Sequence, residues 1–247
     1  KQQEKLSSLQ VAADDADIAI IGFDCRFPGQ SNDPESFWRL LAEGTDAVVD
    51  DTSTRWSQDA YLGSADEAGK SYSMSAGLVD GVDQFDPFFF NVSPREAETM
   101  DPQQRLTLET SWRALEHAGI STSSLGGSKT GVFIGVGDNE YMQHCYASTA
   151  DENIGHVASS NALNVIAGRV AYTLGLQGPC MVVDTACSSS LVAVHLACQS
   201  LRNGESRLAL AGGVNVLVSG DTFVSLSKAN MLSPTGRCQT FSENADG

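Results

Sequence analysis

The chain has 247 residues, 41% of them hydrophobic, and its 31 acidic and 15 basic side chains give a formal net charge of -16. A chain of this length can bury a substantial core in one or two domains. The negative charge repels nucleic-acid phosphates and anionic membrane surfaces, so we expect neither as a partner.

The two ends carry little structural signal. The chain starts at Lys1, not Met, and stops at Gly247 without a polar tail, so we expect a segment of a longer polypeptide. Residues 1–16 are polar and then acidic, which favours a linker or a docking-helix remnant. No apolar run reaches the roughly 18 residues that span a bilayer, and no signal peptide opens the sequence, so we expect a cytoplasmic location.

The cysteine pattern indicates free thiols. The six cysteines are widely spaced and form no C-x-x-C pair. His144 and Cys145 are the only adjacent His/Cys pair, and they lack partners at metal-ligand spacing, so we expect no metal site.

The first ordered elements are a strand and a capped helix. Residues 17–22 form a short β-branched apolar run that ends in glycine, which predicts a buried strand. Asp33 is positioned to cap a helix that begins at Pro34 and ends at Gly44. Residues 45–92 have no sustained period and are interpreted as a partly structured excursion that covers the core.

Two further helices are predicted near residue 100. Ser93 to Glu96 form a capping-box sequence, and Asp101-Pro102 restarts or kinks the helix, which ends at Gly119. Residues 131–137 then predict a second strand. Their glycine spacing is G-x-x-x-G-x-G and no capped apolar helix follows, so we discount a nucleotide-binding loop.

The last part of the chain alternates strands with a helix. Residues 180–186 predict a third strand, and a helix follows from Cys187 to Asn203-Gly204 with Leu191, Val194, Cys198 and Leu201 on one apolar face. Residues 208–218 predict a fourth strand. Nearly continuous apolar strands alternating with helices indicate a mainly parallel sheet covered on both faces, and hence the α/β class.

Cys187 stands where a buried strand passes into a helix. A helix N-terminus presents unpaired N–H groups and the positive end of the helix dipole, which stabilise a thiolate. The same N–H groups can bind the oxyanion that forms when a thioester is attacked. The alternative is that Cys187 is only a small residue at a tight turn, because free cysteine is often buried.

The stretch from Gly178 to Leu191, which contains Asp184-Thr185-Ala186-Cys187-Ser188-Ser189-Ser190, resembles the active-site signature of polyketide β-ketoacyl synthases. Other segments resemble that family in the same order: 18–22, 26–29, 37–38, 85–87, 93–97, 100–105, 168–172, 211–215 and 232–238. The triple serine resembles the modular type I group, and the presence of the cysteine separates the chain from loading variants and chain-length factors that replace it.

The resemblance implies a thiolase-like fold, layered αβαβα, of which residues 17–247 would be mainly the N-terminal βαβαβ half of a ketosynthase domain, with the C-terminal half missing. It implies that Cys187 accepts an acyl chain from the phosphopantetheine arm of an acyl carrier protein, with no cofactor bound directly. A malonyl-type extender would then condense with that chain by decarboxylative Claisen chemistry. The family also implies a homodimer through residues 180–186, and neighbouring acyltransferase or other megasynthase domains.

The histidines of this chain do not match the family's decarboxylation machinery. In that family two histidines and a lysine follow the nucleophile in the second half, beyond Gly247, so we expect the chain alone to be inactive in condensation. Residues 153–156 read like the second histidine motif but lie before Cys187, so His156 is interpreted as a loop or surface residue. His195 lies roughly 12 Å along the helix from Cys187 and cannot act directly as its base.

Two other functions stay open. A cysteine-dependent thioester hydrolase would share the nucleophile and release a free acid, although the motif order disfavours it. A non-enzymatic dimerisation or carrier-docking scaffold is the second alternative.

Overall fold

The computed structural model describes residues 17–148 and 154–247, which form two compact units. The first unit holds residues 17–24 and Val82–Asn215, and the second holds Cys25–Gly81 and Val216–Gly247. The expected linker or docking helix at 1–16 lies outside the described residues. It stays a prediction that residues 17–247 form the N-terminal portion of one ketosynthase domain.

The first unit is built on a parallel sheet of three strands. They are β1 (Thr130–Gly135), β2 (Cys180–Val183) and β3 (Leu208–Gly213), in the spatial order β2-β1-β3. β1 therefore pairs with a parallel strand on each side. The predicted α/β class with a parallel sheet is confirmed, and each strand is shorter than its predicted range, because hydrogen-bonded pairing ends before the apolar sequence does.

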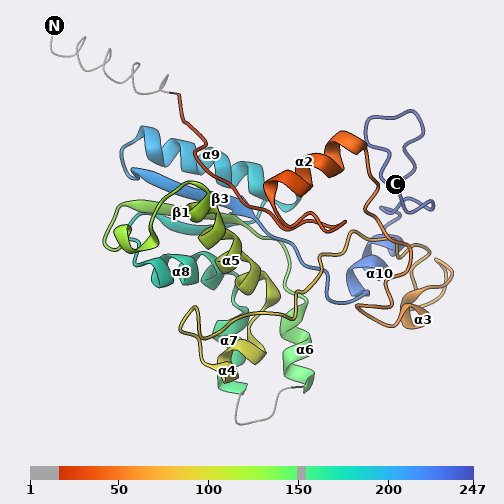
Figure 1. Cartoon of the computed structure of the whole chain (residues 1–247). Helices are drawn as coiled ribbons and strands as arrows, with labels where there is room; N and C mark the ends of the chain where they lie inside the picture. Colours follow the sequence, from red (N-terminus) through yellow and green to blue (C-terminus); the bar gives the residue numbers. More distant parts are fainter. Residues whose placement is uncertain (1–16, 149–153) are drawn as a thin grey trace, which may run out of the picture. The chain divides into compact units, whose positions relative to one another are not determined.

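Helices cover both faces of this sheet (Figure 1). All six residues of β1 are buried. Val132 and Ile134 join the main cluster with α5 (Pro102–His117) and α8 (Leu163–Leu174), whereas Phe133 points to α9 (Ser189–Arg202). The chain runs from β1 through α8 to β2 and returns through α9 to β3. Helical connections between parallel strands are right-handed, and the connection through α8 crosses the sheet in the opposite direction to the connection through α9. The two helices therefore lie on opposite faces of the sheet.

Local capping fixes the starts of three helices where the sequence predicted them. The Asp33 carboxylate accepts a hydrogen bond from Ser36 N at 2.8 Å at the start of α2 (Pro34–Glu43), which ends at Gly44 with φ 63°. Ser93 caps α4 (Pro94–Thr99), and Asp101 caps α5. α2 belongs to the second unit, whereas α4, α5, α6 (Tyr141–Ser148) and α7 (Ile154–Asn161) belong to the first. No helix in the described part of the chain is long and apolar enough to cross a membrane.

The predicted strand at residues 17–22 is wrong. These residues are irregular and pair with no strand of the described sheet. Ile20 and Ile21 are 87% and 56% exposed. A Cβ at Gly22 would lie 2.7 Å from the Ala114 carbonyl oxygen, so this segment runs against the end of α5. Apolar sequence without a partner strand does not make a sheet, because pairing supplies the backbone hydrogen bonds.

The predicted apolar face of α9 is not the face that packs on the sheet. Leu191 is 74% exposed, and the residues that α9 buries are small ones. They are Ser189, Ala193, Ala197 and Ser200. Small side chains let the helix axis approach the alanine- and glycine-containing strands closely, so the helix packs through them and not through its leucines.

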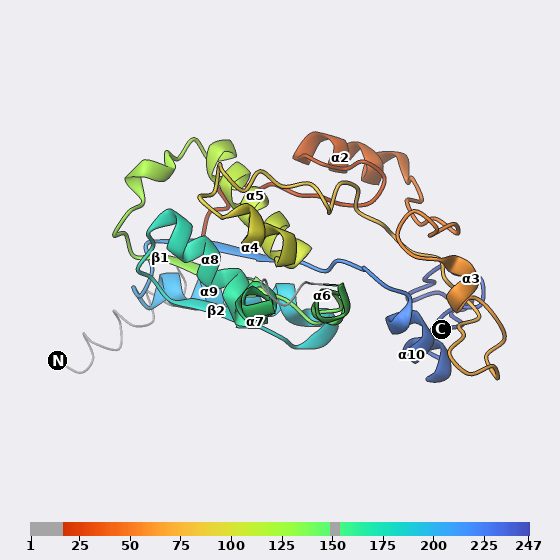
Figure 2. The ribbon, with the colours of Figure 1, turned by 90° about the horizontal axis from the view of Figure 1, so that it is seen from below.

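The second unit has its own small apolar cluster. Trp56, Met74, Ala76 and Phe223 are buried together. α3 (Gln58–Tyr61) lies beside α10 (Asp221–Lys228) in this unit (Figure 2), and the ring of Tyr61 lies against the backbone of Gly220. The expected excursion at residues 45–92 is thus divided between the units, since Phe90 is buried in the cluster of the first one.

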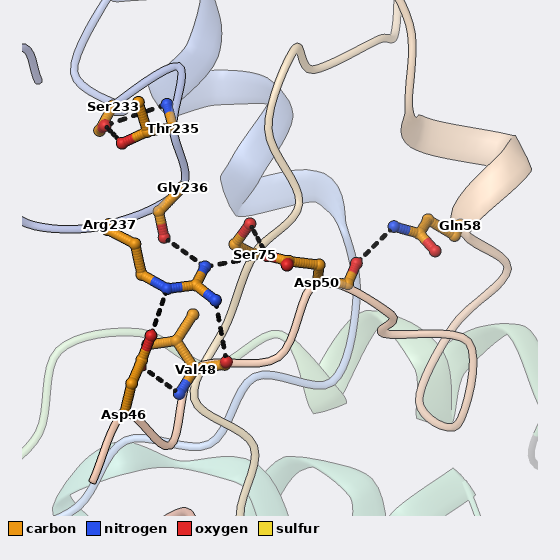
Figure 3. Close-up of polar contacts among 9 residues, drawn as sticks. All are labelled: Asp46, Val48, Asp50, Gln58, Ser75, Ser233, Thr235, Gly236 and Arg237. Carbon is orange, nitrogen blue, oxygen red and sulfur yellow. Dashed lines mark hydrogen bonds and ion pairs between the residues drawn. The ribbon is translucent and has the colours of Figure 1, made fainter.

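Arg237 joins two distant segments of the second unit (Figure 3). Its Nε donates to Asp46 Oδ2 at 2.5 Å and its Nη1 donates to Asp50 Oδ1 at 2.8 Å. Its Nη2 donates to the Val48 carbonyl oxygen at 3.2 Å. The guanidinium therefore fixes the 46–50 segment against the chain's last residues through three separate acceptors.

The same contacts shift ionisation equilibria. Hydrogen bonds from Val48 N–H and from Arg237 hold the pKa of Asp46 below its ordinary value. Hydrogen bonds from Arg237 and Ser75 lower the pKa of Asp50. A carboxylate whose folded-state pKa is depressed stabilises the fold above the unfolded pKa of about 3.9, and this contribution is lost as the pH falls through the folded pKa.

Replacing Arg237 should therefore lower stability in a pH-dependent way. We expect Arg237→Gln to lower the thermal midpoint by a few degrees at pH 7, since both carboxylates lose their cation, and by progressively less between pH 4 and pH 2. Arg113→Gln is the matched control, because Arg113 is exposed on α5. Thermal melts at several pH values measure the midpoints of both variants. A difference in midpoint between Arg237→Gln and the native protein that persists unchanged at pH 2 would contradict the assigned contacts of Arg237 with the two carboxylates.

Candidate active site

Cys187 lies in a short turn between a strand and a helix. β2 ends at Val183, a single 3-10 turn covers Ala186–Ser188, and α9 begins at Ser189. The side chain of Cys187 is exposed, as a thiol that meets a substrate must be. The structure thus places the predicted nucleophile at the N-terminus of a 14-residue helix, where unpaired N–H groups and the helix dipole favour negative charge.

The residue before the cysteine has an unusual backbone conformation. Ala186 has φ 54°, in the left-handed region that residues with a Cβ rarely adopt. Such a conformation costs about 1–2 kcal/mol and persists only where surrounding contacts impose it. The left-handed residue makes the chain reverse sharply, so that Cys187 projects at the apex of the turn, as nucleophiles do in other strand-to-helix turns.

Side-chain hydrogen bonds hold this turn. Ala186 N donates to Asp184 Oδ1 at 2.9 Å, and Thr185 N donates to Ser189 Oγ at 2.9 Å. The Ser189 hydroxyl donates in turn to the Ala186 carbonyl oxygen at 2.7 Å. The Ser188 hydroxyl donates to the Thr185 carbonyl oxygen at 2.9 Å. The turn is therefore held by its own polar side chains.

Two glycines let α9 begin directly over the sheet. A Cβ at Gly135, the last residue of β1, would lie 2.6 Å from both Ser189 C and Ser190 N. A Cβ at Gly213, the last residue of β3, would lie 2.7 Å from Ser190 Cβ. The first turn of α9 thus occupies the space that side chains at these two positions would fill. Since the strands are parallel, this is the carboxyl edge of the sheet, where α/β proteins usually bind ligands.

None of the four histidines hydrogen-bonds to Cys187 in the part of the chain that the structure describes. His195 is exposed on α9, and its Nε2 atom lies 3.3 Å from Nε2 of Gln199. His156 is exposed on α7, so it is a surface residue on a helix and not on a loop. His117 Nδ1 accepts a hydrogen bond from Phe23 N, and His144 lies next to the ring of Tyr141.

The other thiols are less suited to nucleophilic attack. Cys25 and Cys145 are buried. Burial raises the pKa of the Cys145 thiol and that of the Cys180 thiol, so their thiolate fractions at neutral pH are small. Cys187 alone combines exposure with a helix N-terminus among the described cysteines.

The role of Cys187 as the nucleophile stays a prediction, and sequence reasoning did not single out the residues that hold the turn around it. Asp184 and Ser189 were quoted only as parts of the signature, and Gly135 was considered only as part of a discounted glycine loop. The available signal was that the predicted strands at 131–137 and 208–218 contain internal glycines, which often mark a place where another backbone approaches closely.

The profile of the family described as "Beta-ketoacyl synthase, N-terminal domain" matches residues 15–247. The chain belongs to the β-ketoacyl synthase family. Relatives of this ketosynthase chain at 48% identity include polyketide synthase GfsA of Streptomyces halstedii, over 97% of the chain and 3% of that protein. Pikromycin polyketide synthase component PikAII of Streptomyces venezuelae is also 48% identical, over 95% of the chain and 6% of that protein.

Solved structures give the same family. An oxazolomycin ketosynthase domain of Streptomyces albus matches with a TM-score of 0.85 and 38% identity, over 94% of this chain and 41% of that one. The module 6 ketosynthase of the Bacillus subtilis bacillaene synthase matches with a TM-score of 0.78 and 38% identity, over 93% and 37%. The expected thiolase-like fold of polyketide ketosynthases is confirmed, and the chain spans less than half of either solved domain.

The glycine at the end of β1 offers a direct test of this geometry. We expect Gly135→Ala to destabilise the fold by about 1–3 kcal/mol, because the added methyl group overlaps the backbone of α9. It should also change the alkylation rate of Cys187, since the first turn of the helix must move. Gly212→Ala is the matched control, because a Cβ there meets no atom within 4 Å.

Denaturant unfolding, combined with peptide mapping of iodoacetamide-labelled Cys187, measures both effects. If the Gly135→Ala and Gly212→Ala proteins behave alike, the close approach of α9 to β1 does not position the cysteine.

Proposed function

We propose that this chain is the nucleophile-bearing part of a polyketide ketosynthase and that Cys187 receives the acyl chain. The observation that carries the proposal is the placement of an exposed cysteine at a strained strand-to-helix turn over the carboxyl edge of a parallel sheet. Membership of the β-ketoacyl synthase family supports it.

The acyl transfer follows from this geometry. The thiolate of Cys187 attacks the carbonyl carbon of an acyl thioester, and the carbonyl oxygen becomes an oxyanion beside the N–H groups at the start of α9. The new C–S bond forms as the bond between carbonyl carbon and donor sulfur breaks. The donor leaves as a thiolate and takes up the proton that Cys187 released, so the step needs no oxidant or reductant.

The relatives are polyketide synthases. By extension, the donor thiol is the phosphopantetheine arm of an acyl carrier protein, and the extender is a malonyl-type unit that loses CO₂ as it condenses. Neighbouring acyltransferase or other domains would act beside this one, and the cytoplasm is the expected compartment. The thioester hydrolase alternative shares the first step and differs in releasing a free acid.

Loading of Cys187 is tested by intact-mass analysis. We expect the parent polypeptide to gain one acyl mass from an acyl N-acetylcysteamine thioester, and Cys187→Ala to gain none, because the attacking atom is gone. Cys238→Ala is the matched control, since Cys238 is also exposed. It should load as the native protein does.

Labelling that persists in Cys187→Ala would contradict the assignment. Release of free acid at the rate of loading would favour the hydrolase. A malonyl thioester added after loading tests the next step: we expect a condensation product from the complete domain and none from the 247 residues alone, because the family resemblance assigns decarboxylation to two histidines and a lysine of the second half.

We further propose that the domain is a homodimer through β2. β2 pairs only with β1 among the described strands, so its other edge is available for pairing, and Met181 is 39% exposed there. A charged side chain on an edge strand opposes pairing. We expect Met181→Arg to give a monomer in light scattering and Met231→Arg, which changes an exposed methionine of the second unit, to leave a dimer. A dimer in both variants would place the interface elsewhere.

A further inference from the structure

The hydroxyl of Ser189 makes two hydrogen bonds around the strained residue. It accepts from Thr185 N at 2.9 Å and donates to the Ala186 carbonyl oxygen at 2.7 Å. A hydroxyl has one proton to donate and lone pairs to accept, so a single Oγ satisfies both groups. Ser189 also donates its own backbone N–H to the Ala186 carbonyl oxygen. Ser189 therefore determines how the peptide group after Ala186 is oriented.

That peptide group contains the N–H of Cys187. A trans peptide is planar, and its C=O and N–H point in opposite directions. Fixing the Ala186 carbonyl therefore fixes the direction of the Cys187 N–H. This N–H belongs to the same residue as the attacking sulfur, and it must be aimed correctly to bind the oxyanion.

The sheet holds Ser189 itself in place. Its side chain is only 6% exposed, and its backbone lies in the space that a Cβ at Gly135 would occupy. The backbone of Ser189 is thus held against the sheet, and its hydroxyl points toward the preceding turn. Asp184 acts on the other side, where its carboxylate accepts from Ala186 N at 2.9 Å. Asp184 is exposed, so its contact with the turn is less confined than that of the buried hydroxyl.

We propose that Ser189 is a positioning residue for acyl transfer, whose hydroxyl orients the Ala186–Cys187 peptide so that the Cys187 N–H points at the developing oxyanion. The inference rests on the proposed role of Cys187 as the acyl acceptor. Ser189 does not touch the substrate. It acts through the backbone, so it should affect attack on a carbonyl more than attack on a carbon that forms no oxyanion.

Two reactions of the same thiol separate these effects. Acylation by an N-acetylcysteamine thioester passes through an oxyanion, whereas alkylation by iodoacetamide is a direct displacement of iodide at carbon. The informative quantity is the ratio of the two rate constants at Cys187, measured by peptide mapping in the parent polypeptide. A general loosening of the fold would change both rates, whereas a misdirected Cys187 N–H lowers acylation selectively.

The Ser189→Thr and Ser189→Val variants form a matched pair, because the two side chains have nearly the same shape and differ in the hydroxyl. We expect Val to lower the ratio of acylation to alkylation by about 10- to 100-fold relative to Thr, since small misplacements at a reacting centre cost up to about 100-fold. Ser189→Ala should resemble Val. Ser190→Ala, on the next residue of the helix, should keep the native ratio.

Equal ratios in the Thr and Val variants would overturn the inference while leaving Cys187 as the nucleophile. If Val and Ala do not fold by thermal melting while Thr does, the hydroxyl is needed for the fold and not for orientation, which also overturns it. A native protein that is alkylated but not acylated at Cys187 would instead remove the proposed function, and the inference with it.

Discussion

The close approach of α9 to the sheet is the constraint on which the site depends. Ala193 and Ala197 pack against the face of β1 that carries Phe133. Gly135 and Gly213 leave room for the first turn of the helix at the ends of two strands. Side chains of ordinary size at these positions would move the helix outward, because a packed interior has little free space. The position of Cys187 therefore follows from how small the neighbouring residues are.

The turn before α9 joins this packing to chemistry. Ala186 is held in a conformation that it would not adopt alone, and the groups that hold it are Asp184 and Ser189. Ser189 belongs both to the buried face of α9 and to the hydrogen bonds of the turn. The stability of the helix–sheet contact thus offsets the backbone strain at Ala186. The strained turn places the Cys187 thiol at the surface. Strain at a functional site is maintained in this way by the structure around it.

The sequence predicted local features well and non-local ones poorly. The caps at Asp33 and Ser93 and the helix restart at Asp101-Pro102 were correct, because a cap is a hydrogen bond between residues two or three positions apart. The strand at residues 17–22 was wrong, because its formation depends on a partner strand. The buried face of α9 was not predicted, because large apolar residues usually mark the core and here close packing selects alanine and serine. The left-handed Ala186 carried no signal, since glycine and asparagine normally occupy that region.

Acyl loading and condensation make different demands on the protein, and the described residues bear on the first. The proposed loading step needs a thiolate and a correctly aimed N–H, and in the proposal both come from residues within a few positions of Cys187. Decarboxylation needs groups that stabilise a carbanion equivalent, and no imidazole of the described chain hydrogen-bonds to the cysteine. His195 cannot approach it without unwinding α9, because more than two helical turns separate the two residues. The geometry of Cys187 is therefore set by its own strand, turn and helix, independently of the groups that act in the later step of the proposed reaction.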